Sequence, residues 1–224
     1  MRGFAAKTGF APHDLSGVES ALFGGTLPTL ALQHAFYRRD VIGVQDIMAM
    51  FFYFMHFVLP IVIGFVFWVN SREHYRRFIA ALLLMCFLAF VTYLFWPSAP
   101  PWWQVHSVIK VNDQTVEKLW GSGYFLSPLY RSLNPNQFAA FPSLHAAFPA
   151  LAAVYAWRRY RVLAIGLVFW TLAVWISIVY LGEHYVIDAL DGMVYVAAAT
   201  LIVESIYRRR ARVTAVATPA TPSA

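Results

Sequence analysis

Long apolar stretches, separated by short links that are often basic, dominate the pattern of this chain. A helix needs about 20 mainly apolar residues to cross the hydrocarbon core of a bilayer. We expect five such spans, at Ile47–Val69, Phe78–Trp96, Phe141–Trp157, Val162–Leu181 and Tyr185–Tyr207. The pattern therefore predicts an all-α protein, a polytopic membrane helix bundle with five clear transmembrane spans.

The two ends of the chain break this pattern. Residues Ser20–His34 are apolar but contain two glycines and a proline, so we interpret them as an interfacial or re-entrant helix pair. Residues 211–224 combine Ala, Thr, Pro and Val without periodicity, which predicts a disordered tail. We therefore expect one membrane domain, residues 1–210, followed by the tail 211–224.

The composition supports the membrane interpretation. The chain is 60% hydrophobic and only 12% charged, whereas soluble domains carry about 25% charged residues. The net charge of +6 comes from basic residues beside apolar segments, a pattern typical of membranes rather than of nucleic-acid binding. The single cysteine excludes an intramolecular disulfide and any cysteine-based metal cluster.

Three arginine clusters predict the orientation. They follow the first, third and fifth spans: Arg72, Arg76 and Arg77; Arg158, Arg159 and Arg161; Arg208, Arg209, Arg210 and Arg212. Arginine and lysine accumulate on the cytoplasmic side of membrane proteins, so we expect all three clusters there. The loop Pro97–Ala140 and the link Gly182–His184 then lie on the opposite face. Residues 1–46 are formally neutral, so charge does not assign their side.

Two polar clusters on that opposite face carry candidate chemistry. His145 lies at the start of the third span, and His184 precedes the fifth. Asp188 follows His184 by one helical turn, so the two side chains share a face. A carboxylate there can hold one ring N–H of His184 and leave the other nitrogen as a nucleophile. His145 can then act as a general acid and base.

Simpler interpretations of these residues stay open. A histidine in a membrane helix can be an interhelical hydrogen-bond partner, and Ser143 can be a helix cap and nothing else. Ser143 and the free N–H groups after Pro142 can also hold phosphate oxygens. A metal site would use both histidines with Asp188 and Glu183. Two histidines and one sure carboxylate do not form a recognised ligand spacing, so we predict no metal.

The residues at these two clusters resemble the motifs of the type 2 phosphatidic acid phosphatase superfamily. Pro142, Ser143 and His145 match its Pro-Ser-x-His motif, and Ser177, His184 and Asp188 match most of its Ser-Arg-x5-His-x3-Asp motif. The phrases Phe141–His145 and Pro97–Trp102 are similar to the branch that contains fungal inositol-phosphorylceramide synthase and its bacterial and archaeal relatives.

The resemblance implies a bundle of membrane helices that works without a metal or other cofactor. It also implies a role for each matching residue. His184 would be the nucleophile that forms a phosphohistidine, Asp188 would orient it, and His145 would be the general acid and base. Ser143 would bind phosphate.

The chain departs from the superfamily where cations bind phosphate. Ile178 follows Ser177 in place of the motif arginine, and the Lys-x6-Arg-Pro motif expected near Pro97 is absent. We therefore add Ser177, Lys110 and Arg131 to Ser143 as candidates for binding phosphate or substrate.

Together these features predict a multi-pass membrane enzyme with its active site on the non-cytoplasmic face. It would transfer or hydrolyse a phosphoryl-containing headgroup of a phospholipid in the outer leaflet, most simply as an inositolphosphotransferase. The acceptor would be an alcohol or water. One alternative is a lipid-phosphate phosphatase, and another is a non-enzymatic lipid-binding or transport bundle.

Overall fold

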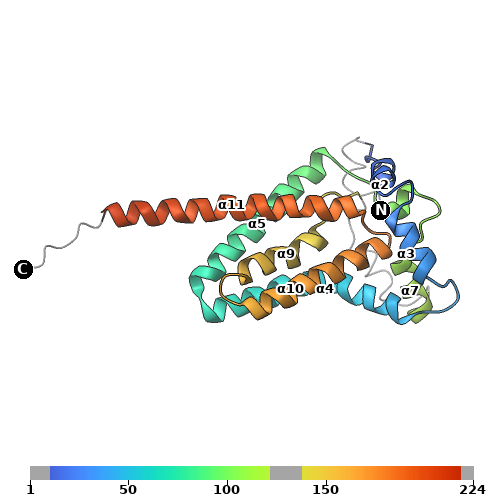
Figure 1. Cartoon of the computed structure of the whole chain (residues 1–224), viewed down its shortest axis with the longest axis horizontal. Coiled ribbons are helices and arrows are strands. Elements are labelled where there is room, and N and C mark those ends of the chain that lie inside the picture. Colours follow the sequence, from blue (N-terminus) through green and yellow to red (C-terminus); the bar gives the residue numbers. More distant parts are fainter. Residues whose placement is uncertain (1–10, 122–137, 218–224) are drawn as a thin grey trace, which may run out of the picture.

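The structure is a computed structural model, and it describes residues 11–121 and 138–217. In these residues the chain forms helices and two isolated bridges that join His13, Ser98 and Ala139. The helices are α2 Ser16–Leu22, α3 Pro28–Phe36, α4 Val44–Asn70, α5 Arg72–Phe95, α6 Pro101–Gln104, α7 Val111–Trp120, α9 Leu144–Ala156, α10 Arg161–Tyr180 and α11 Val186–Ala217 (Figure 1). The predicted all-α class is confirmed.

The number of full spans differs from the expectation of five. Among the described residues, four helices are long and apolar enough to cross a membrane, namely α4, α5, α10 and α11. The remaining predicted span, Phe141–Trp157, corresponds to α9, which has only 13 residues and measures about 20 Å at 1.5 Å per residue. It is short because it starts at Leu144, after the cap residue Ser143, rather than at Phe141.

The surface of the long helices is apolar. Large side chains that are more than half exposed project from all four of them: Ile61, Phe65, Leu83, Phe87, Phe169 and Leu201. Exposed apolar area on this scale is unfavourable in water and favourable in lipid. The chain is therefore an integral, multi-pass membrane protein.

Helix α9 forms the centre of the bundle and packs against α4, α5, α10 and α11 (Figure 1). Its buried faces carry small residues, including Ala146, Ala147 and Ala150, which let neighbouring helices approach closely. The approach is tightest at α11, where a Cβ atom on Gly192 would lie 2.7 Å from the carbonyl oxygen of Ser143. A larger residue at position 192 would push apart the first turns of α9 and α11.

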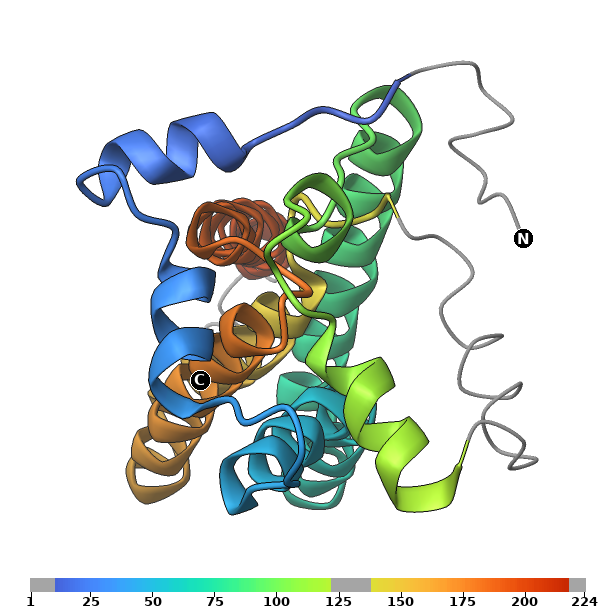
Figure 2. The same ribbon diagram turned by 90° about the vertical axis from the view of Figure 1, so that its right-hand side faces the viewer.

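The short helices cover one end of this bundle. Helices α2, α3, α6 and α7 all lie at the end that faces the viewer in Figure 2. The helix pair predicted at Ser20–His34 is present as α2 and α3, joined through Gly24 and Gly25, both with positive φ. The Gln33 amide of α3 donates to the carbonyl oxygens of Ile109 (2.7 Å) and Tyr180 (2.9 Å). It therefore ties the loop before α7 to the end of α10.

Helix α11 extends well beyond the other helices (Figure 1). It continues to Ala217 and so includes residues 211–217, for which the composition predicted disorder. Three of the seven residues 211–217 are alanine, the residue that most favours helix. Residues 218–224 lie outside the described part of the chain.

Candidate active site

The candidate site lies where the first turns of α9 and α11 meet the extended segment 138–142. Ser98, from the stretch Pro97–Trp102, holds this segment in place. Its backbone N–H donates to the Phe138 carbonyl at 2.9 Å, and its hydroxyl oxygen accepts from the Phe141 N–H at 2.7 Å. The Pro97–Trp102 stretch therefore supports the wall of the site.

His184 is buried in this site, with 4% of its surface exposed. Its Nδ1 atom lies 2.9 Å from the carbonyl oxygen of Ala140 and 3.5 Å from Oδ2 of Asp188. A carbonyl oxygen only accepts hydrogen bonds, so Nδ1 carries the proton. In the neutral ring, Nε2 is then the atom with a free lone pair.

His145 faces that lone pair. Its Nδ1 atom lies 3.0 Å from His184 Nε2. If Nε2 of His184 is unprotonated, Nδ1 of His145 must be the donor in this hydrogen bond. The structure therefore brings the two predicted histidines into direct contact. The proton on His184 Nδ1 determines which nitrogen donates in that contact.

Two aromatic residues of α4 complete the cluster, and sequence reasoning did not assign them to the site. The Tyr53 ring stacks on His145 at a centroid distance of 4.6 Å. The His56 ring contacts the same imidazole at 3.8 Å, and its Nδ1 hydrogen-bonds the Tyr53 carbonyl oxygen. Their helical spacing was the only available signal, since it places both rings on one face of α4.

Asp188 and Ser143 connect the two helix ends. The Asp188 carboxylate is fully buried and accepts a hydrogen bond from the Tyr185 N–H at 2.8 Å. The backbone carbonyl oxygen of Asp188 accepts from the Ser143 N–H at 3.0 Å. The Ser143 hydroxyl accepts from the Ala146 N–H at 3.4 Å. Ser143 is thus a helix cap in this structure, beside the histidines.

A buried carboxylate from α2 occupies the N-terminus of α11. Glu19 accepts from the backbone N–H groups of Val186 (2.9 Å) and Ile187 (3.1 Å) and has no exposed surface. Burial raises the pKa of this carboxyl, and the two backbone hydrogen bonds oppose the shift. The N-terminus of a helix favours a nearby negative charge. Glu19 supplies that charge to α11, although the two are distant in the sequence.

The link between α10 and α11 is packed tightly against the outer loop. Gly182 has a φ of 78°, and a Cβ atom there would lie 2.9 Å from the carbonyl oxygen of Ile109. Glu183 is 6% exposed and accepts from the Asn112 side chain at 3.0 Å. Burial raises the pKa of the Glu183 carboxyl. Among the described residues, no group of three His, Cys, Asp or Glu side chains has the arrangement of a metal site.

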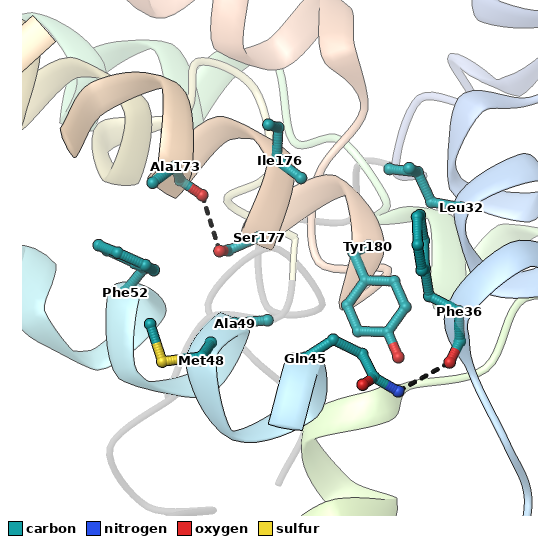
Figure 3. A pocket seen from close by; sticks show the side chains of 10 residues that line it. All are labelled: Leu32, Phe36, Gln45, Met48, Ala49, Phe52, Ala173, Ile176, Ser177 and Tyr180. Carbon is teal, nitrogen blue, oxygen red and sulfur yellow. Dashed lines mark hydrogen bonds between the residues drawn. The ribbon is translucent and has the colours of Figure 1, made fainter. Parts of the chain in front are cut away.

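The structure separates Ser177 from the histidine cluster. Its hydroxyl donates to the Ala173 carbonyl of its own helix at 2.7 Å. It lines an apolar cavity of about 310 Å³ between α3, α4 and α10, and neither histidine lines that cavity (Figure 3). The prediction that Ser177 binds phosphate finds no support in this geometry, because its hydroxyl is bonded within α10 and lines a cavity that neither histidine reaches.

The two predicted cations also lie outside the cluster or outside the described residues. Lys110 forms an ion pair with Asp113 at 3.2 Å and lies over the Trp102 ring at 4.5 Å. Its charge is therefore already partnered. Arg131 falls in the segment 122–137, which is not among the described residues.

The fold and the site define a class: a membrane helix bundle in which two histidines and an aspartate meet at adjacent helix ends. A model of the PAP2 superfamily matches residues 13–202. The chain belongs to this superfamily, as its motifs indicated.

Two curated relatives are similar to the chain and belong to one branch of the superfamily by name. The chain is 32% identical over 200 residues to the phosphoinositol dihydroceramide synthase of Bacteroides thetaiotaomicron, a match that covers 81% of this chain and 64% of that protein. It is 26% identical over 193 residues to the inositol phosphorylceramide synthase of Candida albicans, covering 80% of this chain and 39% of that protein. The chain spans less than two thirds of the length of either relative. No solved structure matches it.

Proposed function

We propose that this protein is a membrane enzyme that transfers a phosphoryl-containing headgroup of a phospholipid through a phosphohistidine on His184. The observation that carries the proposal is the orientation of His184, whose Nδ1–H is held by the Ala140 carbonyl while Nε2 faces His145. The names of both relatives describe synthases of inositol-containing sphingolipids, which favours an inositolphosphotransferase-like activity.

In this proposal His184 Nε2 attacks phosphorus. Attack consumes the Nε2 lone pair and leaves positive charge on the ring. Asp188 Oδ2, 3.5 Å from Nδ1, and the Ala140 carbonyl can stabilise that charge. Both acceptors are in place before the reaction, so little reorganisation is needed when the charge develops.

His145 supplies the proton. Its Nδ1–H, which caps the nucleophile in the free protein, faces the point where a phosphoryl oxygen would enter. In its imidazolium form the ring can protonate the leaving oxygen and become neutral, and the neutral ring can later remove the proton of the acceptor. The 3.0 Å between the two nitrogens leaves no room for a phosphorus atom, so the substrate must displace the His145 ring. The rings of Tyr53 and His56, which contact the His145 ring, would border the path of that displacement.

The charge around the site favours a phosphodiester donor. A phosphomonoester carries about −1.5 to −2 charges near neutral pH, whereas a diester carries one. Each additional charge needs a donor or cation in a site of low dielectric. Ile178, at the position of the motif arginine, is fully buried and apolar, and Lys110 is partnered by Asp113.

The proposed face of reaction is the non-cytoplasmic one, and the donor is a lipid of that leaflet. The histidine cluster lies at the end of the bundle opposite the one that carries Arg72 and Arg76, in the first two turns of α5, and Arg158, in the turn after α9. Arginine-rich linkers favour the cytoplasmic side. The aromatic Trp102 and Trp103 lie at the histidine end, where they suit a lipid or polyol alcohol and help to exclude water.

The test compares donors on purified protein in mixed micelles. Phosphatidylinositol and phosphatidic acid are supplied with and without a lipid alcohol, and headgroup transfer and phosphate release are measured. We expect headgroup transfer from the diester phosphatidylinositol. His184→Ala should abolish both this transfer and the formation of the phosphoenzyme. Rapid phosphate release from phosphatidic acid, with no reaction on the diester, would identify a lipid-phosphate phosphatase instead. Full turnover in His184→Ala would contradict the phosphohistidine.

A further inference from the structure

A second polar cavity lies at the other end of the bundle, between α5, α9 and α11. Its volume is about 250 Å³. Tyr155, which lines it, is ten residues along α9 from His145, or about 15 Å along the helix axis. Thr200 and Glu204 line it from α11, about three turns and more beyond Asp188. The cavity is therefore separate from the candidate active site.

Three buried polar atoms in this cavity have no hydrogen-bond partner among the described residues. They are Nε2 of His74, Oη of Tyr155 and Oγ1 of Thr200. Tyr155 is only 5% exposed, so water on the protein surface does not solvate its hydroxyl. Leaving a buried polar group without a partner is unfavourable. Three such atoms from three helices surround one cavity, where a single polar ligand can satisfy them together.

The charge of the cavity selects the sign of that ligand. The one carboxylate that lines it, Glu204, is paired with Arg77 at 3.0 Å. Arg77 also pairs with Glu73. Two further arginines, Arg158 and Arg159, line the cavity from the turn after α9, and both are exposed. Because the acidic group is already neutralised, the excess charge at the cavity is positive and favours an anion.

We propose that this cavity binds a phosphate group, carried either by a phospholipid headgroup or by a free phosphate. The hydroxyls of Tyr155 and Thr200 would donate to phosphate oxygens. Arg158 would contribute a charged, planar pair of donors, which matches phosphate geometry. The volume accommodates one phosphate and part of a headgroup, but not a whole lipid, whose acyl chains would lie along the outside of the bundle.

The experiment measures thermal unfolding of the purified full-length protein in a neutral detergent. One arm adds inorganic phosphate against sodium chloride of equal ionic strength. The other adds micellar phosphatidic acid against diacylglycerol. At a probe concentration about 100-fold above Kd, the expected rise in Tm is about 5–10 °C. A rise in one arm only identifies the source of the phosphate, and a rise in neither arm overturns the proposal.

Variants locate the binding. Tyr155→Phe removes only a hydroxyl that has no partner, so without a probe its Tm should not fall, whereas the probe should bind roughly 10–100-fold more weakly. Arg158→Gln should weaken binding similarly. Arg76→Gln is the matched control, because Arg76 is exposed at the same end but does not line the cavity. His184→Asn should retain the rise, since the other site is altered.

Three results would contradict the assignment. An equal loss of the probe-dependent rise in Arg76→Gln and Arg158→Gln would indicate unspecific charge attraction. Loss of the rise in His184→Asn, with retention in Arg158→Gln, would place the phosphate at the candidate active site. A lower Tm of Tyr155→Phe without probe, together with an unchanged rise, would show that the hydroxyl has a structural role.

Discussion

Replacing His145 with alanine should separate proton transfer from phosphoryl transfer. His145 Nδ1 lies 3.0 Å from the nitrogen proposed to attack phosphorus, so it is within reach of the oxygens of a bound phosphoryl group. A positioned general acid contributes about 10²–10⁴-fold to a rate. We therefore expect His145→Ala to lower turnover by that factor on a lipid donor whose leaving oxygen needs a proton.

The same variant should lose much less on a donor whose leaving group is already a stable anion. Such a group departs without a proton, so the rate of leaving-group release in the first turnover should fall less than about tenfold. The remaining loss in that step would come from the cavity left by the missing ring, since His145 acts as a base only when the acceptor attacks later.

His56→Ala is the matched control for that cavity. It removes an imidazole of the same size from the same cluster, with its ring centroid 3.8 Å from that of His145. Without a proton-transfer role, it should lower turnover of both donors by the same factor. Initial rates on the two donors, measured with each variant in mixed micelles, give the comparison. Equal losses on both donors in His145→Ala would refute the acid role.

Three further predictions concern topology, metal and pH. In a Cys86→Ala background, a cysteine at Gly121 should react with an impermeant thiol reagent in intact cells and one at Ser71 should not; the reverse labelling would invert the orientation. Excess chelator should leave turnover unchanged and vanadate should inhibit, because its trigonal-bipyramidal adduct resembles the in-line transition state; chelator inactivation reversed by one divalent ion would instead indicate a metal site. Burial raises the pKa of Glu183 in the folded protein, so the folded state holds this proton more tightly than the unfolded state. Stability should therefore fall as pH rises above the ordinary carboxyl pKa. Glu183→Gln should reduce that fall, to which the raised pKa of Glu19 also contributes, in a series of Tm measurements across pH, whereas Glu73→Gln, at an exposed position, should leave it; an unchanged pH profile in Glu183→Gln would contradict the assignment.

The sequence was sufficient to predict the helices that depend on one strong signal. Long apolar runs mark α4, α5, α10 and α11, because lipid requires every backbone group to be bonded within the helix. Hydropathy failed at α9 because the apolar run continues through Phe141 and Pro142. Those residues lie outside the helix, which starts at Leu144, and the Ala140 carbonyl just before them bonds to His184. The run is therefore longer than the helix.

The candidate site was predictable only in part, for a related reason. Helical spacing places His184 and Asp188 together, and the topology brings His145 to the same level. Nothing in the spacing shows which face of α4 meets α9. The contact between His56 and His145 could therefore be found only in the structure. Conversely, a motif match placed Ser177 in the site, although its hydroxyl faces another cavity.

The N-terminal helices contribute to the site without lying in it. Glu19 of α2 holds the first N–H groups of α11, directly after His184. Gln33 of α3 holds the last carbonyl of α10 and the loop before α7 at Ile109. Residues 22–29, which include the turn through Gly24 and Gly25, lie between these two anchors. Their constraint is thus geometric: the glycine turn sets the distance between Glu19 and Gln33, and the two side chains fix both ends of the link that carries His184. A change in the length of that turn should therefore disturb His184 even though no residue of the turn contacts it.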